Sequence, residues 1–236
     1  MKTVLYIHGK GGNASESTHY ERLFPDCKVI GLDYRVSRKT LSVSRGTRRS
    51  AFAERDFKGE NFKKLKFFEV PCKTFSPWET GKEIHEVVVS LKTDAESIIL
   101  IANSIGAFFS MNANLNSLIE KAYFILPIVN MEKLICDMMK WADVTEAELE
   151  QRKIITTDFG EELSWEYLCY VREHPLNWLV PTSILYGEND NLTSLETIKD
   201  FAEKQGANLT VMKGGEHWFH TEEEMKFLDE WIRSQK

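Results

Sequence analysis

Three side chains that together can attack and release an acyl group stand far apart in the sequence. Ser104, Asp190 and His217 occur in that order along the chain. A serine hydroxyl becomes an effective nucleophile only when a base accepts its proton, and an imidazole base needs a carboxylate to hold its tautomer and stabilise its positive charge. The set therefore predicts nucleophilic acyl transfer, provided that the fold brings the three residues together.

The serine lies where an apolar run gives way to a helical segment. Residues 98–101 form a short aliphatic run, typical of a strand buried on both faces, and helical character resumes at Ile105. A tight strand-to-helix turn strains the serine backbone, so the residues two before and two after it must be small. Ala102 and Gly106 meet this demand, with alanine standing where glycine is usual. The alternative is that Ser104 is an ordinary helix N-cap.

The remaining patterns predict the elements that must position these residues. Short apolar runs alternate with amphipathic segments, which indicates a doubly wound, mostly parallel α/β sheet. We expect its strands at residues 2–7, 27–32, 97–101, 123–126, 183–186 and 209–212. Capping boxes that start at Ser76 and Thr221 and a glycine at position 206 predict helix ends between and after these strands. In such a sheet the loops at the carboxyl ends of the strands converge on one edge, where ligands bind. The serine, the carboxylate, the imidazole and the glycine-rich loop after the first strand all lie at that edge.

A long interval separates two of the predicted sheet strands. Residues 131–178 contain segments with helical spacing, among them a predicted helix over residues 163–170, and a capping box at Thr145-Glu146-Ala147-Glu148, and no convincing strand. We therefore expect a small helical cap, which should roof the cleft above Ser104. Trp141, Trp165, Tyr167 and Trp178 are candidates for the lining of an apolar acyl pocket, or else for the core of the cap itself.

A basic segment interrupts an otherwise acidic chain. Residues 35–75 hold twelve Lys and Arg against four Asp and Glu, a charge of +8. Because the net charge of the whole chain is −6, the remaining residues carry −14. We interpret the segment as a basic insertion within a single domain spanning residues 1–236. A solvated charged loop is the plain interpretation. The alternative is contact with an acidic surface of a second copy, giving a homo-oligomer, or with a polyanion.

Four motifs stand at corresponding strand ends: His8-Gly9-Lys10-Gly11-Gly12, Asn103-Ser104-Ile105-Gly106, Gly187-Glu188-Asn189-Asp190 and Gly215-Glu216-His217. With these motifs the chain resembles the α/β-hydrolase superfamily, in particular its small single-domain serine hydrolases and esterases. The resemblance covers nearly the whole chain apart from the basic segment. It implies the α/β-hydrolase fold, in which the catalytic residues follow the chain order serine, acid, histidine.

The resemblance also implies a role for each residue. Ser104 is the expected nucleophile, His217 the general base and then acid, and Asp190 the orienting carboxylate. The expected oxyanion hole is formed by the backbone N–H of Ile105 with that of Lys10 or Gly11. The rivals to the acid and base are Glu188 and His220, and we expect His8 to be structural.

The expected function is that of a serine hydrolase cleaving an ester, thioester or amide of a small molecule through an acyl-enzyme. One alternative is an NAD(P)-dependent Rossmann oxidoreductase, because residues 9–14 fit G-x-G-x-x-A and Asp33 follows Ala14 by 19 residues. Another is a binding protein that keeps the hydrolase fold without catalysis.

Composition sets the remaining expectations. The four cysteines, at positions 27, 72, 136 and 169, form no C-x-x-C pair, and His217 and His220 have no metal-binding partner motif, so we expect no metal and no cofactor. No run of about 18 apolar residues occurs, and the apolar start is too short for a signal-peptide core. We expect a cytoplasmic protein with a small-molecule acyl substrate, no membrane contact and no specific nucleic-acid partner.

Overall fold

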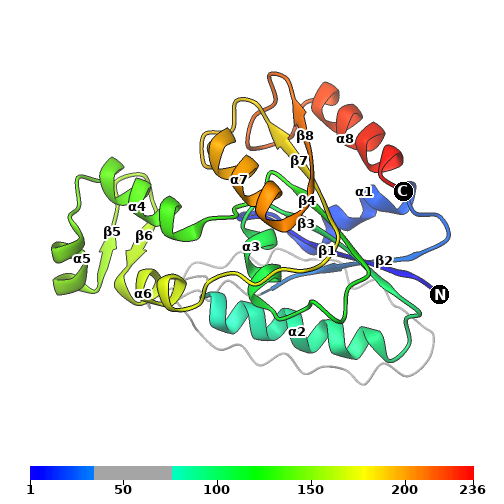
Figure 1. Ribbon diagram of the computed structural model, residues 1–236, viewed down its shortest axis with the longest axis horizontal. Coiled ribbons are helices and arrows are strands. Elements are labelled where there is room, and N and C mark those ends of the chain that lie inside the picture. Colours follow the sequence, from blue (N-terminus) through cyan, green and yellow to red (C-terminus); the bar gives the residue numbers. More distant parts are fainter. Residues whose placement is uncertain (35–75) are drawn as a thin grey trace, which may run out of the picture. The chain divides into compact units, whose positions relative to one another are not determined.

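The computed structural model describes residues 1–34 and 76–236. Its central element is a six-stranded sheet in which every neighbouring pair is parallel, which confirms the predicted fold class (Figure 1). The strands lie in the order β2 (Lys28–Leu32), β1 (Thr3–Ile7), β3 (Ile98–Asn103), β4 (Lys121–Ile125), β7 (Thr182–Gly187) and β8 (Asn208–Met212). The basic segment 35–75, which we predict to be an insertion, lies outside the described residues.

Strand β3 is buried in the middle of this sheet, between β1 and β4. Leu100 pairs with Leu5 of β1 and with Ala122 of β4, and all three side chains are fully buried. A strand that is covered on both faces loses nothing by being apolar throughout, which is why β3 shows a continuous aliphatic run instead of alternation. The run ends at Asn103, so the polar residues that follow emerge at the carboxyl edge of the sheet.

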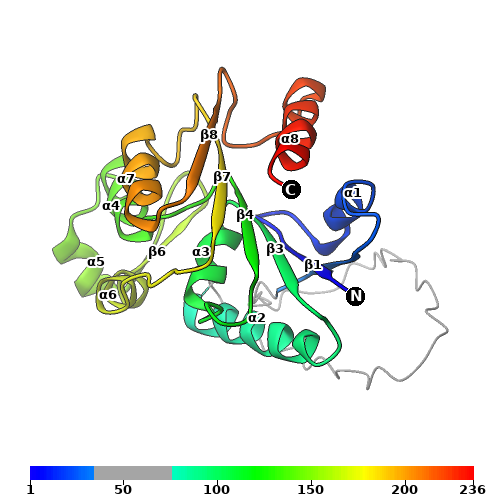
Figure 2. The same ribbon diagram turned by 45° about the vertical axis from the view of Figure 1, so that its right-hand side comes forward.

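Helices cover both faces of the sheet (Figure 2). The 3₁₀ turn η1 (Ala14–Ser17), α1 (Thr18–Glu21) and α8 (Glu222–Ser234) lie on one side; α2 (Pro77–Lys92), α3 (Ile105–Asn112) and α7 (Leu195–Gln205) lie on the other. The α1 and α8 side packs Phe24 and Trp231 against Tyr123 of β4. This two-sided cover is the doubly wound arrangement.

Most of the predicted helix ends are confirmed. The capping boxes at Thr145 and Thr221 form with both reciprocal hydrogen bonds, and Gly206 closes α7 in the left-handed conformation with φ 62°. The box predicted at Ser76 is wrong. Its hydroxyl donates to the Glu79 carboxylate over 2.8 Å and accepts no backbone N–H.

The segment between β4 and β7 contains three helices, α4 (Met131–Trp141), α5 (Glu146–Arg152) and α6 (Trp165–Glu173), and a two-stranded antiparallel sheet. The prediction that this segment lacks strands is wrong, because β5 (Ile154–Thr156) pairs with β6 (Glu162–Ser164). Strands of three residues are too short for alternation to be recognised in the sequence. The helix predicted to start at residue 163 begins instead at Trp165, after the strand.

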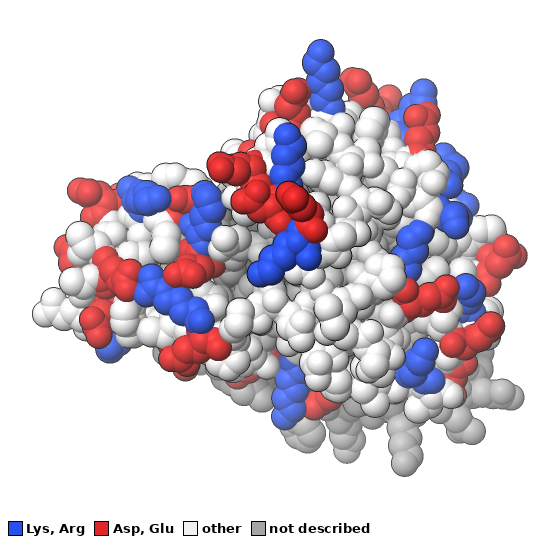
Figure 3. All heavy atoms as spheres, viewed as in Figure 1, with Lys and Arg blue, Asp and Glu red and all other residues white. Residues whose placement is uncertain are grey.

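Charged side chains of both signs are interleaved over the face shown in Figure 3. In the segment between β4 and β7, for which we keep the short name cap, the Arg172 guanidinium joins α6 to Glu132 of α4 over 2.7 Å and to Glu146 of α5 over 2.6 and 2.9 Å. These pairs hold the three cap helices together. Within residues 1–34 and 76–236, no helix is long and apolar enough to cross a membrane.

Candidate active site

Ser104 occupies a strained turn between β3 and α3. Its backbone has φ 51° and ψ −122°, a conformation that residues other than glycine rarely adopt. The Ser104 N–H donates to the Ile125 carbonyl over 3.0 Å, and the Ser104 carbonyl accepts from the N–H groups of Ala107 and Ile128, each at 3.1 Å. Its side chain makes no helix-capping bond. The surrounding backbone therefore fixes the strained turn and leaves the hydroxyl free for another partner.

The residues two before and two after Ser104 are small for different structural reasons. A Cβ at Gly106 would lie 2.4 Å from the His8 carbonyl oxygen and 2.8 Å from that of Ile7, so α3 packs directly on the end of β1. Ala102 is fully buried but its φ lies outside the left-handed region. Alanine is tolerated there because the strain of the turn falls on Ser104 itself.

The three residues expected to do chemistry form one chain of hydrogen bonds. Ser104 Oγ lies 2.8 Å from His217 Nε2, and His217 Nδ1 lies 2.7 Å from Asp190 Oδ2. The other Asp190 oxygen accepts the N–H groups of Leu192 at 2.8 Å and Thr193 at 2.9 Å. The Asp190 side chain is fully buried and that of His217 is 14% exposed. A carboxylate held on both oxygens keeps a proton on Nδ1 and leaves Nε2 to accept from the serine.

Backbone donors lie close to the serine. The Ile105 N–H is the first of α3, so it has no acceptor within the helix. The glycine-rich loop passes beside Ser104, because a Cβ at Gly9 would stand 3.1 Å from the Ser104 Cβ. In the described part of the chain, no acceptor is bound to the N–H of Lys10 or Gly11. Within residues 1–34 and 76–236, the N–H groups of the three predicted oxyanion residues therefore have no acceptor, and Gly9 brings the glycine-rich loop next to Ser104.

Solved structures share the fold of this chain, although no family model and no curated protein matches the sequence. Est1E from Butyrivibrio proteoclasticus superposes with a TM-score of 0.67 at 13% identity, over 99% of this chain and 86% of that one. The chain has the α/β-hydrolase fold. Mouse alpha/beta hydrolase domain-containing protein 10 gives 0.66 at 14% identity, over 99% and 88%. MGS-MChE2, an α/β hydrolase from a lagoon-sediment metagenome, gives 0.56 at 18%, over 99% and 91%.

The residues considered as rivals take other places in this α/β-hydrolase fold. Glu188 accepts the N–H of Gly214 over 2.9 Å. His220 is half-exposed and its Nδ1 lies 2.7 Å from the Trp218 carbonyl. His8 is buried, with its Nδ1 2.7 Å from the Gly9 carbonyl and its ring stacked on Tyr34. Each of the three therefore supports a loop at the carboxyl edge of the sheet.

The acidic residue of the alternative dinucleotide-binding motif is hydrogen-bonded to the end of the glycine-rich loop. Asp33 Oδ1 accepts the Ala14 N–H over 2.5 Å. The loop then enters η1, a 3₁₀ turn of four residues, instead of a long α-helix. A Rossmann site places the pyrophosphate at the start of such a helix, and that support is missing at Ala14.

The cap reaches the glycine-rich loop through an ion pair. Glu161, in the turn between β5 and β6, binds the Lys10 ammonium group. The turn itself is held by Thr157, whose Oγ1 donates to the Glu161 carbonyl and accepts the Glu161 N–H. Because the backbone N–H of Lys10 belongs to the predicted oxyanion hole, the pair ties the position of the cap hairpin to that loop.

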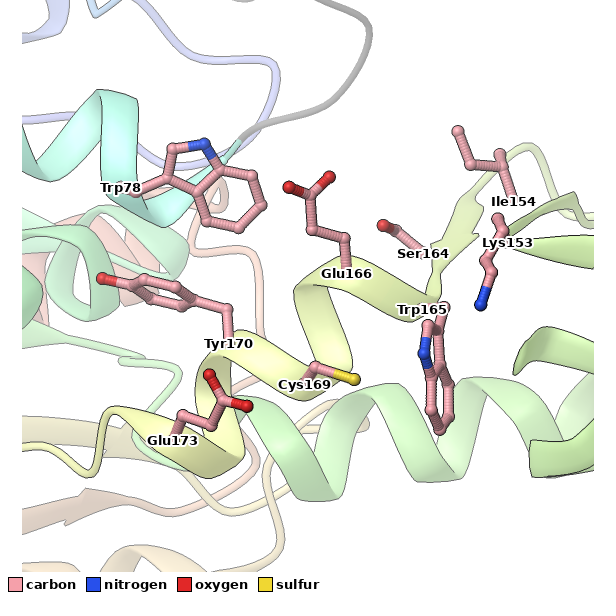
Figure 4. A pocket seen from close by; sticks show the side chains of 9 residues that line it. All are labelled: Trp78, Lys153, Ile154, Ser164, Trp165, Glu166, Cys169, Tyr170 and Glu173. Atoms are coloured by element: carbon pink, nitrogen blue, oxygen red, sulfur yellow. The ribbon is translucent and has the colours of Figure 1, made fainter. Parts of the chain in front are cut away.

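The aromatic residues predicted to line an acyl pocket are spread over several environments. Trp178 is buried against Phe124, and Trp141 is 54% exposed. Trp165 lines a cavity of about 630 Å³ between α6, β5 and the start of α2, which none of the triad residues lines (Figure 4). Tyr167 contacts Phe108 of α3, the helix that Ser104 opens. Of the four aromatic residues, Tyr167 is the one with a ring contact to α3.

Glu224 supports the histidine loop, a role that its sequence position does not reveal. The capping box at Thr221 predicts its bonds to the N-cap, but its carboxylate also accepts the N–H of Glu216 at 3.2 Å and of His220 at 3.0 Å. Burial would raise the pKa of Glu224, yet the hydrogen bonds from Thr221, His220 and Glu216 together lower the pKa to about 2. One buried carboxylate thus holds both sides of His217.

Replacing Glu224 by glutamine should therefore remove an acid-sensitive part of the stability. A carboxylate whose pKa falls from 4.5 to about 2 on folding contributes about 3 kcal/mol above pH 4.5, and this is lost as the pH falls towards 2. Urea unfolding from pH 7 to pH 2 should show this loss in the wild type and a flatter profile in Glu224→Gln. Glu223→Gln, on the exposed side of the same turn, is the control and should follow the wild type.

Proposed function

We propose that the protein is a serine hydrolase that cleaves an ester, thioester or amide of a small molecule through an acyl-enzyme intermediate. The observation that carries the proposal is the hydrogen-bond chain from Ser104 Oγ through His217 to Asp190, with bonds of 2.8 and 2.7 Å. A buried carboxylate, an imidazole and a serine in a strained turn, in this order, are what acyl transfer requires. The hydrolase names of several similar structures add support.

In the acylation step, Ser104 Oγ attacks the carbonyl carbon while its proton passes to His217 Nε2. The Asp190 carboxylate stabilises the resulting imidazolium. The oxygen of the tetrahedral intermediate accepts hydrogen bonds from the N–H of Ile105 and of Lys10 or Gly11, which stand ready before the charge develops. His217 then gives its proton to the leaving group.

In the deacylation step, water takes the place of the leaving group. His217 accepts a proton from the water, which attacks the acyl carbon, and then returns the proton to Ser104 Oγ. The carboxylic acid leaves and the enzyme is restored. Apart from the substrate and water, every step uses groups of the chain itself, so the proposal requires no cofactor.

Hydrolysis of p-nitrophenyl esters of graded acyl length tests the proposal. We expect turnover, with a burst of p-nitrophenol close to the enzyme concentration wherever deacylation is the slower step. The acyl length giving the highest kcat/KM reports the size of the acyl site. Saturable binding of the esters without turnover would instead support a binding protein. Binding of NAD(P)H, followed by its fluorescence, would support the oxidoreductase.

A further inference from the structure

A cavity of about 650 Å³ lies on the side of the sheet covered by α1 and α8, and its lining includes the sequence neighbours of Ser104 and His217 but none of the triad residues. We call it the α1–α8 cavity. The residue before the nucleophile, Asn103, lines it, and so do Trp218 and Phe219, which directly follow His217. Ile125, whose carbonyl holds the Ser104 N–H, completes this end. The volume is within the range of small-molecule sites.

The cavity lies on the same side of the sheet as the loop that carries His217, which indicates the part of the substrate that the cavity would hold. On the proposed function, on which this inference rests, His217 must deliver its proton to the leaving oxygen, so the leaving group lies on the histidine side. The cap contacts the opposite face through Tyr167 and Phe108 of α3. The ends of β3 and β4 therefore divide the site into a cap side and an α1–α8 side.

The charged side chains of the cavity are already paired. Glu16 accepts the Tyr6 hydroxyl at 2.5 Å and the Asn13 N–H at 3.1 Å. Asp229 binds Arg22 over 2.6 Å and His19 over 2.7 Å. A charged leaving group would find no free counter-ion among these residues, so the lining favours a neutral one.

Two further features favour hydroxyl groups on that neutral molecule. The Asn103 Oδ1 is buried and has no hydrogen-bond partner in the described part of the chain. The Asn103 side chain also hydrogen-bonds Tyr6, which lines the same cavity, and the terminal torsion of asparagine is broad, so a small turn of the amide brings Oδ1 towards a donor there. The Trp218 ring stacks on His220 and is still 72% exposed, so its remaining aromatic surface is open to a carbon skeleton. Unpaired amide oxygen and exposed indole together suit a hydroxylated alcohol.

We propose that the α1–α8 cavity binds the alcohol portion of the ester and selects neutral alcohols with additional hydroxyl groups, such as polyols or sugars. The balance of the step is simple. The bond from Ser104 Oγ to the acyl carbon forms, the bond from that carbon to the alcohol oxygen breaks, and the serine proton passes through His217 to the alcohol. The released alcohol leaves neutral, and no further reactant is needed.

A pair of esters with one acyl group and two alcohols tests the inference. One carries 2,3-dihydroxypropyl and the other 2,3-dimethoxypropyl, which cannot donate. We expect kcat/KM to favour the diol ester by about tenfold in the wild type. The dimethoxy ester would leave the buried Asn103 Oδ1 without a hydrogen-bond donor, and a site built to bind a hydroxyl rejects an analogue that lacks it. Asn103→Leu should reduce the ratio towards one. Tyr167→Phe removes another buried, unpartnered side-chain oxygen, on the cap side, and should leave the ratio unchanged.

Because Asn103 adjoins the nucleophile, Trp218→Ala provides a second variant that does not touch the turn, and it too should lower the ratio. The p-nitrophenyl ester of the same acid measures catalysis without the alcohol. Equal kcat/KM for the two alcohols in the wild type, or a ratio that survives both Asn103→Leu and Trp218→Ala, would overturn the inference while the hydrolase proposal stands. Failure of the wild type to hydrolyse any of the three esters would overturn the hydrolase proposal and with it this inference.

Discussion

Replacing Ser104 by alanine is expected to reduce ester turnover by a factor on the order of 10⁴–10⁶. The substitution removes the oxygen that lies 2.8 Å from His217 Nε2, and no acyl-enzyme can form. His217→Ala should cost a similar factor, because the hydroxyl then has no base. The double variant should be little worse than either single one, since the two residues act as a unit. Steady-state kinetics on the best ester of the panel measures all three.

Ser110→Ala is the matched control for this series. Ser110 lies on α3, the helix that follows the nucleophile, is fully buried and donates to the Gly106 carbonyl over 2.7 Å, without a hydrogen bond to His217. Its loss should leave turnover within a few-fold of the wild type. Normal turnover in Ser104→Ala would contradict the assigned nucleophile. Independent, multiplying losses in the double variant would contradict the shared mechanism.

Gly106→Ala is expected to damage both the fold and the activity. The new Cβ would stand 2.4 Å from the His8 carbonyl oxygen, a backbone atom that cannot turn away, so α3 must move off β1. Overpacking of this kind costs about 1–3 kcal/mol of unfolding free energy. Because Ser104 and the Ile105 N–H precede this residue directly, the shift displaces the nucleophile and an oxyanion donor, and kcat should fall by about 100-fold or more.

Gly81→Ala is the control that distinguishes the local clash at Gly106 from the general effect of adding a methyl group to a helix. A Cβ at Gly81 of α2 would lie 3.3 Å from the Asn112 carbonyl oxygen, a tight contact that a small shift relieves. Alanine also gains up to about 1 kcal/mol over glycine within a helix. Gly81→Ala should therefore stay close to the wild type in thermal unfolding and in kcat. Equal behaviour of the two variants would show that the turn tolerates Gly106→Ala.

The sheet could be predicted from the sequence because its strands carry local signals. Buried parallel strands are short aliphatic runs, and each ends in residues that break the pattern, as β3 does at Asn103. The capping boxes at Thr145 and Thr221 are equally local. The β5–β6 hairpin lacked such a signal, because three-residue strands form only when their partner is present. Ser76 carried the capping signal, but Glu79 took its hydroxyl.

The triad could be predicted from the sequence, but the contacts that support it could not. The residue types of the triad and their places at strand ends could be inferred, since the topology of a parallel sheet brings those ends together. The second role of Glu224 could not, because its bonds to Glu216 and His220 depend on how the loop before α8 folds back. The pair between Lys10 and Glu161 joins residues 151 positions apart and leaves no trace in spacing.

Labelling with a fluorophosphonate tests the central claim most directly. The probe phosphonylates a serine only where a base and an oxyanion hole act on it together. We predict one adduct per chain, located by peptide mass spectrometry on Ser104, lost in Ser104→Ala, strongly slowed in His217→Ala and retained in Ser110→Ala. An adduct on another serine, or hydrolysis of esters by a protein whose Ser104 stays unlabelled, would contradict the assignment of Ser104 as the nucleophile.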